Sequence, residues 1–397
     1  MTPTSNAPAS NAAISSASAP ATAAEVREAV LEASARTTPV RIAACGTWLD
    51  AGRPVRVAHR LSVAALDGIT EYTPGDLTLT ARAGTSLAEI ARVTSAERQW
   101  LALDPHGSPA GSLGATIACA SAGPLAHAYG TPRDNVLGLE AVTGTGAVVR
   151  AGGRVVKNVA GFDLTRLFTG SWGTLGVITE VTVRLRALPE VDESHAIPVD
   201  DDVASLGALA AQLRTAAIAP LALELVNAAL AERLGLQLRA HVLVRLGGNE
   251  DDVRAQRAVL GALGDPVSVS AEVWTTLRGC EPASAAVVRF SMPPSRIAEC
   301  WTFACGATAN TNGAPVHASL GRGVVRCIVP YERATELGAF LAAARAFTGT
   351  RVIERLPAAC WTDDVAPSKV ADRLSRDLKR RFDPMNVLNP GILGVST

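Results

Sequence analysis

Glycine density between residues 105 and 180 constrains what this chain can fold into more than any other feature of its sequence. Glycines recur at short intervals there, with single hydroxyl residues and few bulky side chains between them: Gly107, Gly111, Gly114, Gly123, Gly130, Gly161, Gly170, Gly173 and Gly176. Glycine loses more conformational freedom on folding than any other residue, so ordinary core elements contain little of it. We interpret the density as close approach of the backbone to a large, flat ligand that carries phosphate groups.

Length and charge narrow the class of protein. A chain of 397 residues predicts two or three domains. Lys and Arg together number 37, as do Asp and Glu, and this zero net charge argues against a nucleic-acid-binding protein. No apolar run approaches the roughly 18 residues of a membrane span, which predicts no direct membrane insertion. We therefore expect a cytoplasmic protein that reaches the inner membrane, if at all, through partners.

Residues 1–24 are rich in Ala, Ser, Pro and Thr and contain no charged side chain. A signal peptide has a basic start and an apolar core, and a transit peptide has arginines, so this segment predicts a disordered tail instead. The seven cysteines are scattered and form no C-x-x-C pair. This spacing argues against the common iron–sulfur and zinc motifs and favours reduced thiols in a cytosolic protein.

Residues 25–189 combine strands, turns and short helices. Ser86 and Glu89 have the spacing of a capping box and predict the start of a helix. The turn at Gly144–Gly146 predicts a β-hairpin, and the alternation in residues 177–185 predicts a strand with one wet face. We expect this segment to form one ligand-binding domain.

The remainder of the chain has a different pattern, and together the parts predict an α+β fold. Residues 190–355 alternate strands and helices without dense glycine, which predicts a cap domain of antiparallel sheet with helices on one face. Residues 356–397 contain an amphipathic helix at 368–382 and then the turn Asn389-Pro390-Gly391.

Common nucleotide-binding motifs are absent or lack their context. The P-loop pattern does not occur. Gly144-Thr145-Gly146 begins a Rossmann-like pattern, but Val149 stands at its third glycine and the segment predicts a hairpin. The six histidines lie far apart and show no metal-ligand spacing. These exclusions predict no metal and leave a dinucleotide site that is not of the Rossmann type.

Three segments, in this order, resemble the FAD-binding fold of the vanillyl-alcohol oxidase and p-cresol methylhydroxylase (PCMH) type. The first is the short loop Ala44–Trp48. The second runs from Ser112 to Asp134, and the third from Gly170 to Glu180. The closing Asn-Pro-Gly turn fits the same pattern. As a set, these motifs identify the family more specifically than any one of them alone.

A narrower resemblance is carried by two further stretches. Val156–Leu164 (VKNVAGFDL) and Ala51–Val55 (AGRPV) resemble the FAD-binding small subunit of bacterial glycolate oxidases. The resemblance is strong over roughly residues 40–188 and good over the last thirty residues, and the middle of the chain is compatible with it. It implies FAD as the cofactor.

The resemblance also implies where the FAD diphosphate binds. Backbone N–H groups in a glycine turn form an anion-binding nest without steric cost. We expect Gly46 and Thr47 on one side of the diphosphate, and Ser112, Gly114 and Ala115 on the other.

Other residues are expected along the rest of the cofactor. Ser121 and Gly123 are expected near the ribityl chain or the polar edge of the flavin, and Trp48 in the phosphate loop. Asn389 is expected near the flavin from the C-terminal return. The residues expected against the ring system are Gly173, Gly176, Val177 and Ile178.

Each assignment has a structural alternative. Glycines at 173–176 also permit close packing of a helix on a strand, and Trp48 also fits core packing. Lys157 and Asp163 are equally compatible with a structural ion pair. Tyr129 is expected to pack rather than react.

Two departures from the family pattern shape the functional prediction. The first loop has Cys45 and Trp48 and no histidine for covalent attachment, so we predict non-covalent FAD. Relatives that oxidise 2-hydroxyacids usually carry a metal-binding histidine pair in the cap, whereas His195, His241 and His317 are isolated in this sequence. This implies a chain that binds FAD beside a separate catalytic flavoprotein subunit and an iron–sulfur subunit.

We therefore expect the FAD-binding subunit of a glycolate oxidase complex, which oxidises a small 2-hydroxyacid and passes electrons through FAD to iron–sulfur centres and quinone. One alternative is a stand-alone FAD oxidoreductase of another small alcohol or hydroxyacid, with His106, Tyr129, Arg289 or Arg322 near the ring. Another is a flavin-free structural subunit. The sequence assigns no catalytic residue.

Overall fold

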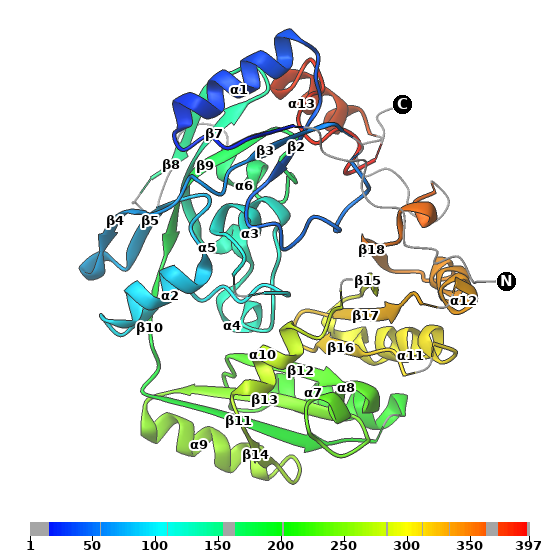
Figure 1. Cartoon of the computed structure of the whole chain (residues 1–397). Coiled ribbons are helices and arrows are strands. Elements are labelled where there is room, and N and C mark those ends of the chain that lie inside the picture. Colours follow the sequence, from blue (N-terminus) through cyan, green and yellow to red (C-terminus); the bar gives the residue numbers. More distant parts are fainter. Residues whose placement is uncertain are drawn as a thin grey trace, which may run out of the picture.

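The computed structural model describes residues 16–394, except residues 56, 109, 154–162, 201, 283–284, 312, 333 and 363–371. It has two halves, which we call the upper and lower half as they stand in Figure 1. The upper half contains a three-stranded and a five-stranded sheet, and the lower half contains an eight-stranded sheet. The first described strand lies in the upper half, and the chain crosses to the lower half after β10 (Arg186–Ala187) and returns for its last helix.

The first strands of the chain form a parallel sheet in the order β1 (Ser16–Ser18), β3 (His59–Ser62), β2 (Val40–Ala43). The expectation of a disordered tail through residue 24 is therefore wrong from residue 16 onward. The side chains of β1 offer little apolar surface, but its backbone gains hydrogen bonds from β3, and sequence composition does not reveal such pairing.

Helix α1 (Ala23–Ala35) follows at once. Its N-cap is Thr22, whose side chain accepts a hydrogen bond from the Glu25 N–H. The helix buries Val26 and Val30 in a core shared with β2 and the C-terminal return. Residues well before residue 40 therefore already belong to the hydrophobic core of the upper half.

The five-stranded sheet is antiparallel throughout. Its order is β4 (Ile69–Thr73), β5 (Thr78–Arg82), β9 (Gly176–Arg184), β7 (Val136–Thr143) and β8 (Val148–Gly152). The predicted hairpin is confirmed, because Thr143 N–H donates to Ala147 O at 2.9 Å between β7 and β8. The predicted strand at 177–185 is confirmed as β9.

Short helices connect these strands: α2 (Leu87–Ser95), α3 (Leu113–Cys119), α4 (Ala126–Tyr129), α5 (Pro132–Asn135) and α6 (Leu164–Phe168), with a 3-10 turn at Pro74–Asp76. The predicted cap of α2 is confirmed, since the Ser86 hydroxyl accepts from Glu89 N–H at 3.1 Å. Two-residue strands β6 (Gln99–Trp100) and β10 pair beside the crossing to the lower half.

The lower half is one antiparallel sheet of eight strands. Its order is β14 (Val267–Val269), β11 (Val191–Pro198), β13 (His241–Gly248), β12 (Ala222–Val226), β16 (Val316–Ser319), β17 (Val324–Pro330), β15 (Ala285–Ser291) and β18 (Thr350–Arg355). Four helices cover one face: α7 (Val203–Thr215), α9 (Glu250–Gly261), α11 (Ile297–Thr308) and α12 (Ala334–Arg345). The shorter α8 (Ala228–Arg233) and α10 (Glu272–Arg278) cover part of the other face.

The period of two along these strands places a polar row on the sheet face opposite the four large helices. In β12, Leu223 and Leu225 enter the helix-covered core, and Glu224 between them points to the other face. The same alternation puts further polar side chains on that face, namely Arg245, Arg289, His317, Arg326 and Glu354. This face looks toward the upper half (Figure 1).

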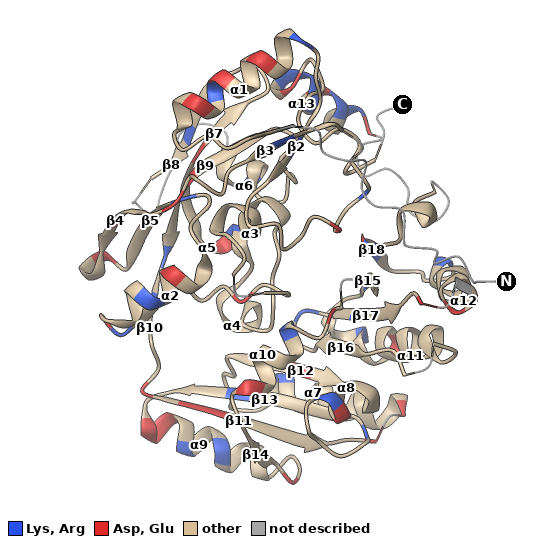
Figure 2. Ribbon diagram, in the orientation of Figure 1, with Lys and Arg blue, Asp and Glu red and all other residues tan. Residues whose placement is uncertain are grey.

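The C-terminal segment returns to the upper half through a 3-10 turn at Ala358–Cys360 and helix α13 (Arg373–Phe382). Of the helix expected at 368–382, residues 368–371 lie outside the described residues. The described helix begins at Arg373, where Asp372 is extended and accepts from Ser375 N–H as the N-cap. Basic side chains gather on α13 (Figure 2). Asn389 N–H then donates to Val40 O at 3.0 Å, which places the chain end beside β2.

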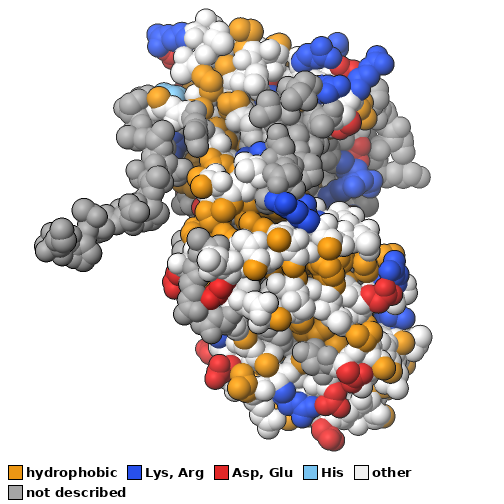
Figure 3. Space-filling model, turned by 90° about the vertical axis from the view of Figure 1, so that its right-hand side faces the viewer, with side chains coloured by type: hydrophobic (Ala, Val, Ile, Leu, Met, Phe, Trp, Pro, Cys, Tyr) orange, Lys and Arg blue, Asp and Glu red, His pale blue; other side chains and the backbone are white. Residues whose placement is uncertain are grey.

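Hydrophobic side chains gather at the level where the two halves meet (Figure 3). Backbone contacts also join the halves, since Gly52 N–H donates to Glu354 O at 2.8 Å and Gly107 N–H to Arg278 O at 2.8 Å. Arg355 Nε lies 2.9 Å from Asp50 Oδ2 across the same junction. Within the described residues, no helix is long and apolar enough to cross a membrane.

Candidate functional site

A cavity opens in the upper half between the loop after β2, helix α3, the start of β9 and the C-terminal return. Because the family resemblance implies FAD binding by these segments, we call it the FAD cavity below. Ten of the thirteen predicted site residues line it: Gly46, Thr47, Trp48, Gly114, Ala115, Gly173, Gly176, Val177, Ile178 and Asn389. Ser112, Ser121 and Gly123 are not among its lining residues. Segments more than 300 residues apart in sequence thus converge on one cavity.

The loop after β2 has the properties of an anion-binding nest. Gly46 has a φ of +79°, a left-handed conformation that favours glycine. The backbone N–H groups of Gly46, Thr47 and Trp48 have no acceptor among the described residues. Unpaired N–H groups lining a cavity suit an oxyanion, so this loop fits the diphosphate of FAD.

The second expected nest does not form at the start of α3. The Ser112 hydroxyl accepts from Ala115 N–H at 3.3 Å as the N-cap of the helix. Gly114 N–H donates to Ala83 O at 2.8 Å. The Gly114 and Ala115 N–H groups therefore already have protein acceptors, whereas the Ser112 hydroxyl keeps its own O–H donor.

Three glycines of this stretch are required by close packing. A Cβ built on Gly114 would lie 2.5 Å from the Ala83 Cβ, and one on Gly123 would lie 1.8 Å from Asp104 O. A Cβ on Gly176 would meet Phe168 at 2.8 Å. At these positions neighbouring protein atoms fill the space of the missing side chain, so packing requires glycine there, and Gly114 and Gly176 also line the cavity.

Gly173 and Asn389 act together at the cavity wall. Gly173 has a φ of +69° and packs against the Asn389 amide. The Asn389 Oδ1 accepts from Ile42 N–H at 2.8 Å, and its Nδ2 donates to Trp172 O at 2.7 Å. The amide thus ties β2 to the Gly170–Gly176 segment and holds the shape of the cavity.

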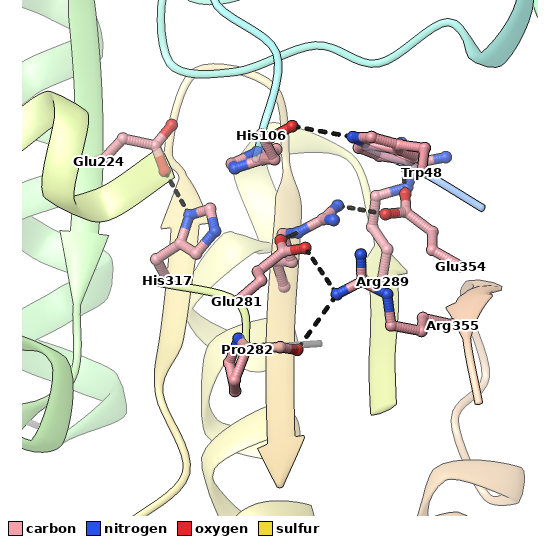
Figure 4. Close-up of polar contacts among 10 residues, drawn as sticks. Trp48, His106, Glu224, Glu281, Pro282, Arg289, His317, Glu354 and Arg355 are labelled. Carbon is pink, nitrogen blue, oxygen red and sulfur yellow. Dashed lines mark hydrogen bonds and ion pairs between the residues drawn. The ribbon is translucent and has the colours of Figure 1, made fainter. Parts of the chain in front are cut away.

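A second cluster lies at the junction of the halves, on the polar face of the large sheet. His317 Nδ1 and Glu224 Oε2 are 2.9 Å apart, and both side chains are buried. The ring centroids of His317 and His106 are 5.2 Å apart, with His106 reaching down from the upper half (Figure 4). Trp48 Nε1 donates to His106 O at 3.2 Å, which links this cluster to the FAD cavity.

The hydrogen bond to Glu224 defines what the His317 ring can do. A carboxylate only accepts, so the Nδ1 of His317 carries the proton and Nε2 presents a lone pair in the neutral ring. Neither His317 Nε2 nor His106 Nδ1 has a partner among the described residues, although both are buried. Burial, with Arg326 and His317 nearby, holds the pKa of His106 well below its usual range, so His106 is neutral.

Ion pairs fix the neighbouring strands. Arg326 pairs with Glu281 at 2.5 Å and also with Glu354. Burial acts to lower the pKa of Arg326, but these two carboxylates outweigh it and raise the pKa. Arg289 lies 3.5 Å from Glu354. The network keeps this part of the polar face rigid.

Arg322 is a cation near the cluster that lacks an ion pair among the described residues. It follows β16 in the turn after Ser319, whose hydroxyl is buried without a partner. Burial lowers the pKa of Arg322, and Glu224 opposes this effect. A half-buried guanidinium beside unpaired polar atoms is suited to an anionic ligand.

Other predictions have varied outcomes. Tyr129 packs edge-on against Trp100 with centroids 5.7 Å apart, as expected. Lys157 and most of the Val156–Leu164 stretch lie outside the described residues, so the alternative of a Lys157–Asp163 ion pair is not tested. The seven cysteines are free, and the part of the chain that the structure describes holds no group of three metal-ligating side chains.

Sequence reasoning missed the meeting of His106 and His317. It treated each histidine alone because spacing along the chain is large. A signal was present, since Glu224 and His317 interrupt apolar strands at positions that alternate with core residues.

Comparison with known proteins identifies the upper half. A family model described as an FAD binding domain matches residues 16–152. The glycolate oxidase subunit GlcE of Escherichia coli (strain K12) is 34% identical over 253 residues, covering 63% of this chain and 67% of GlcE. The chain belongs to this family of PCMH-type FAD-linked oxidoreductases. FAD is accordingly its cofactor, and the open amides of the loop after β2 fit that assignment.

Two further comparisons extend over nearly the whole chain. An FAD-linked oxidoreductase of Mycobacterium tuberculosis (strain ATCC 25618 / H37Rv) is 27% identical over 418 aligned positions, covering 95% of this chain and 90% of that protein. The crystal structure of p-cresol methylhydroxylase with substrate bound matches with a TM-score of 0.77 at 17% identity, covering 98% of this chain and 91% of that one. The second likeness shows the PCMH-type fold.

Proposed function

We propose that this chain is the FAD-binding subunit of a glycolate-oxidase-type complex and that it oxidises a small 2-hydroxyacid at the junction of its two halves. The likeness to a glycolate oxidase subunit supports the substrate class. Residues 25–189 with the C-terminal return, 356–397, form the FAD-binding domain in this proposal, and residues 190–355 form the cap. The observation that carries the proposal is the buried His317–Glu224 pair facing His106.

Oxidation of a 2-hydroxyacid removes a hydride from the carbon and a proton from the hydroxyl group. FAD supplies the acceptor for the hydride. The proton goes to His317 Nε2, which has a free lone pair when Nδ1 donates to Glu224. Glu224 holds the ring in this tautomer and stabilises the imidazolium that forms. The hydride and the proton are thus both accounted for, and the 2-oxoacid product has one hydride and one proton fewer than the substrate.

In this proposal, Arg322 binds the substrate carboxylate. Its guanidinium has no ion pair among the described residues and lies near the same polar face. The Ser319 hydroxyl, buried without a partner, is a second donor on that face. Ser121, whose hydroxyl is also buried without a partner, is proposed to serve the ribityl chain or the flavin edge.

The proposal includes the fate of the electrons and the attachment of FAD. Electrons pass from FAD to an iron–sulfur subunit and on toward quinone, beside a second, catalytic flavoprotein subunit. FAD is held without a covalent bond, because the phosphate loop has Cys45 and no histidine. Acid precipitation of the loaded protein is expected to release all flavin into the supernatant, and flavin retained in the pellet contradicts this part.

The experiment is an anaerobic titration of the FAD-loaded chain, alone, with glycolate and with D-lactate. We expect bleaching of the oxidised-flavin absorbance by at least one of these acids. Ethylene glycol, which has the hydroxyl groups but no carboxylate, is the matched control and is expected to leave the flavin oxidised. If the flavin is bleached only after partner subunits are added, this chain relays electrons and does not oxidise the substrate itself. No bleaching with partners present would contradict the substrate class.

A further inference from the structure

Of the described residues that line the FAD cavity, Arg41 alone carries a formal charge. It lies on β2 and its Nη2 donates to Leu49 O at 3.4 Å. Leu49 directly follows the loop whose Gly46, Thr47 and Trp48 amides are unpaired among the described residues. A cation and a set of open N–H donors therefore share one wall of the cavity.

Arg41 has a second arginine as its neighbour. In the register of β2 and β3, Arg41 is opposite Arg60, so both side chains project from the same face of the sheet. Arg60 Nε is buried without a hydrogen-bond partner. Among the described residues, no carboxylate lies within 4.0 Å of either guanidinium. Like charges placed side by side destabilise a sheet, and a buried cation without a counter-charge is costly.

This arrangement is unfavourable unless an anion is present. Burial lowers the pKa of Arg41, and the charge of Arg60 lowers it further. FAD carries a diphosphate, which supplies two negative charges in a single compact group. That group matches both the two cations and the open amides of the adjacent loop.

We propose that Arg41, backed by Arg60, is the counter-charge of the FAD diphosphate. The amides of Gly46, Thr47 and Trp48 orient the phosphate oxygens, and the guanidinium of Arg41 neutralises them. In this proposal, Arg41 binds the side of the diphosphate for which the start of α3 provides no second nest of open amides. The inference rests on FAD as the cofactor and is independent of the substrate proposed above.

A consequence distinguishes this role from ordinary packing. In the protein without FAD, the paired arginines repel one another and lack a counter-charge, so removal of one charge relieves strain. With FAD bound, the same removal loses an ion pair. Arg41→Gln is therefore expected to raise the melting temperature of the FAD-free protein and to reduce the increase in melting temperature that FAD causes.

The test is FAD binding to the full chain after flavin removal, measured by calorimetry and by quenching of flavin fluorescence. Arg41→Gln is expected to weaken FAD binding by about tenfold or more, because a charge-assisted contact is lost. Arg41→Lys keeps the charge and is expected to lose less. The matched control is Arg36→Gln, since Arg36 pairs at 2.9 Å with Glu32 on the surface of α1. It is expected to change FAD affinity by less than about twofold.

Two fragments of FAD locate the contact. ADP, which has the diphosphate, is expected to lose affinity in Arg41→Gln by the same factor as FAD, whereas riboflavin is expected to bind as to the wild type. An unchanged FAD affinity overturns the proposal, and so does a loss for riboflavin as large as that for FAD, because the cation would then face the ring. If Arg41→Gln fails to fold, Arg60→Gln provides the second variant, with a smaller loss for FAD and ADP alone.

Discussion

His317 and Glu224 share a hydrogen bond of 2.9 Å that joins β16 to β12 at a buried position facing the upper half. The bond fixes the imidazole so that its Nε2 lone pair faces outward from the carboxylate. We expect Glu224→Gln to slow flavin reduction by substrate about 10²–10⁴-fold, the usual contribution of general base catalysis. FAD content is expected to be unchanged. Anaerobic stopped-flow absorbance measures the rate.

The same sheet offers a matched control for this variant. Glu193 and His195 form a second Glu–His contact, at 3.3 Å, on β11. His195 alternates with residues on the opposite face, away from the upper half. Glu193→Gln is therefore expected to leave the rate unchanged. Equal rates in Glu224→Gln and wild type would remove Glu224 from the mechanism.

Asp104 predicts a dependence of stability on pH. Burial raises its pKa to about 7 from an ordinary value of 3.8, against opposition from Arg278 and the Leu125 N–H. The folded protein thus favours the protonated carboxyl. Stability from this group is complete below about pH 4 and is lost as pH rises to about 7. At about 1.4 kcal/mol per pKa unit, the loss is on the order of 4–5 kcal/mol.

Denaturant unfolding at pH 5 and pH 8 measures this effect. Asp104→Asn keeps an acceptor for Leu125 N–H and cannot ionise, so we expect it to be more stable than wild type at pH 8 and closer to it at pH 5. Asp76→Asn, at an exposed carboxylate, is the control and is expected to match wild type at both values. A constant difference between Asp104→Asn and wild type across this range would show that Asp104 is not the titrating group.

Gly123 tests the packing explanation of the glycine-rich stretch. A Cβ at this position would lie 1.8 Å from Asp104 O, so the backbone must move to admit it. We expect Gly123→Ala to lower the free energy of unfolding of FAD-free protein by about 3 kcal/mol or more. Gly75→Ala, where no atom lies within 4 Å of the added carbon, is expected to change it by less than about 1 kcal/mol. Loss of FAD affinity without loss of stability would instead indicate a ligand contact.

Much of the fold was predictable, because local residue patterns and the order of the motifs along the chain indicate it. Ser86 and Glu89 marked a helix start, and the alternation after Gly176 marked β9. The loop at Gly46, the strand start at Val177 and the distant Asn389 converge on one cavity, as the family resemblance implied. Strand β1 was missed, because its stability comes from pairing with β3 rather than from its own side chains.

The site was less predictable, because its central contacts join residues that local patterns treat separately. His106 comes from a loop of the upper half and His317 from the large sheet, and only the packing of the halves brings their rings to 5.2 Å. Arg41 was missed for a similar reason, since its proximity to Arg60 depends on strand register. Packing was also a reason for glycine that local patterns do not reveal, since Ala83 and Asp104 fill the space of a Cβ at Gly114 and Gly123.

The most direct test of the central claim is the rate of flavin reduction in the FAD-loaded chain alone, mixed anaerobically with the acid that bleaches it. We predict that His317→Asn keeps full FAD content and slows this rate by about 10²-fold or more, while His195→Asn, at the matched buried histidine, keeps the wild-type rate. Flavin reduction in His317→Asn at the wild-type rate would contradict the assignment of substrate oxidation to this junction.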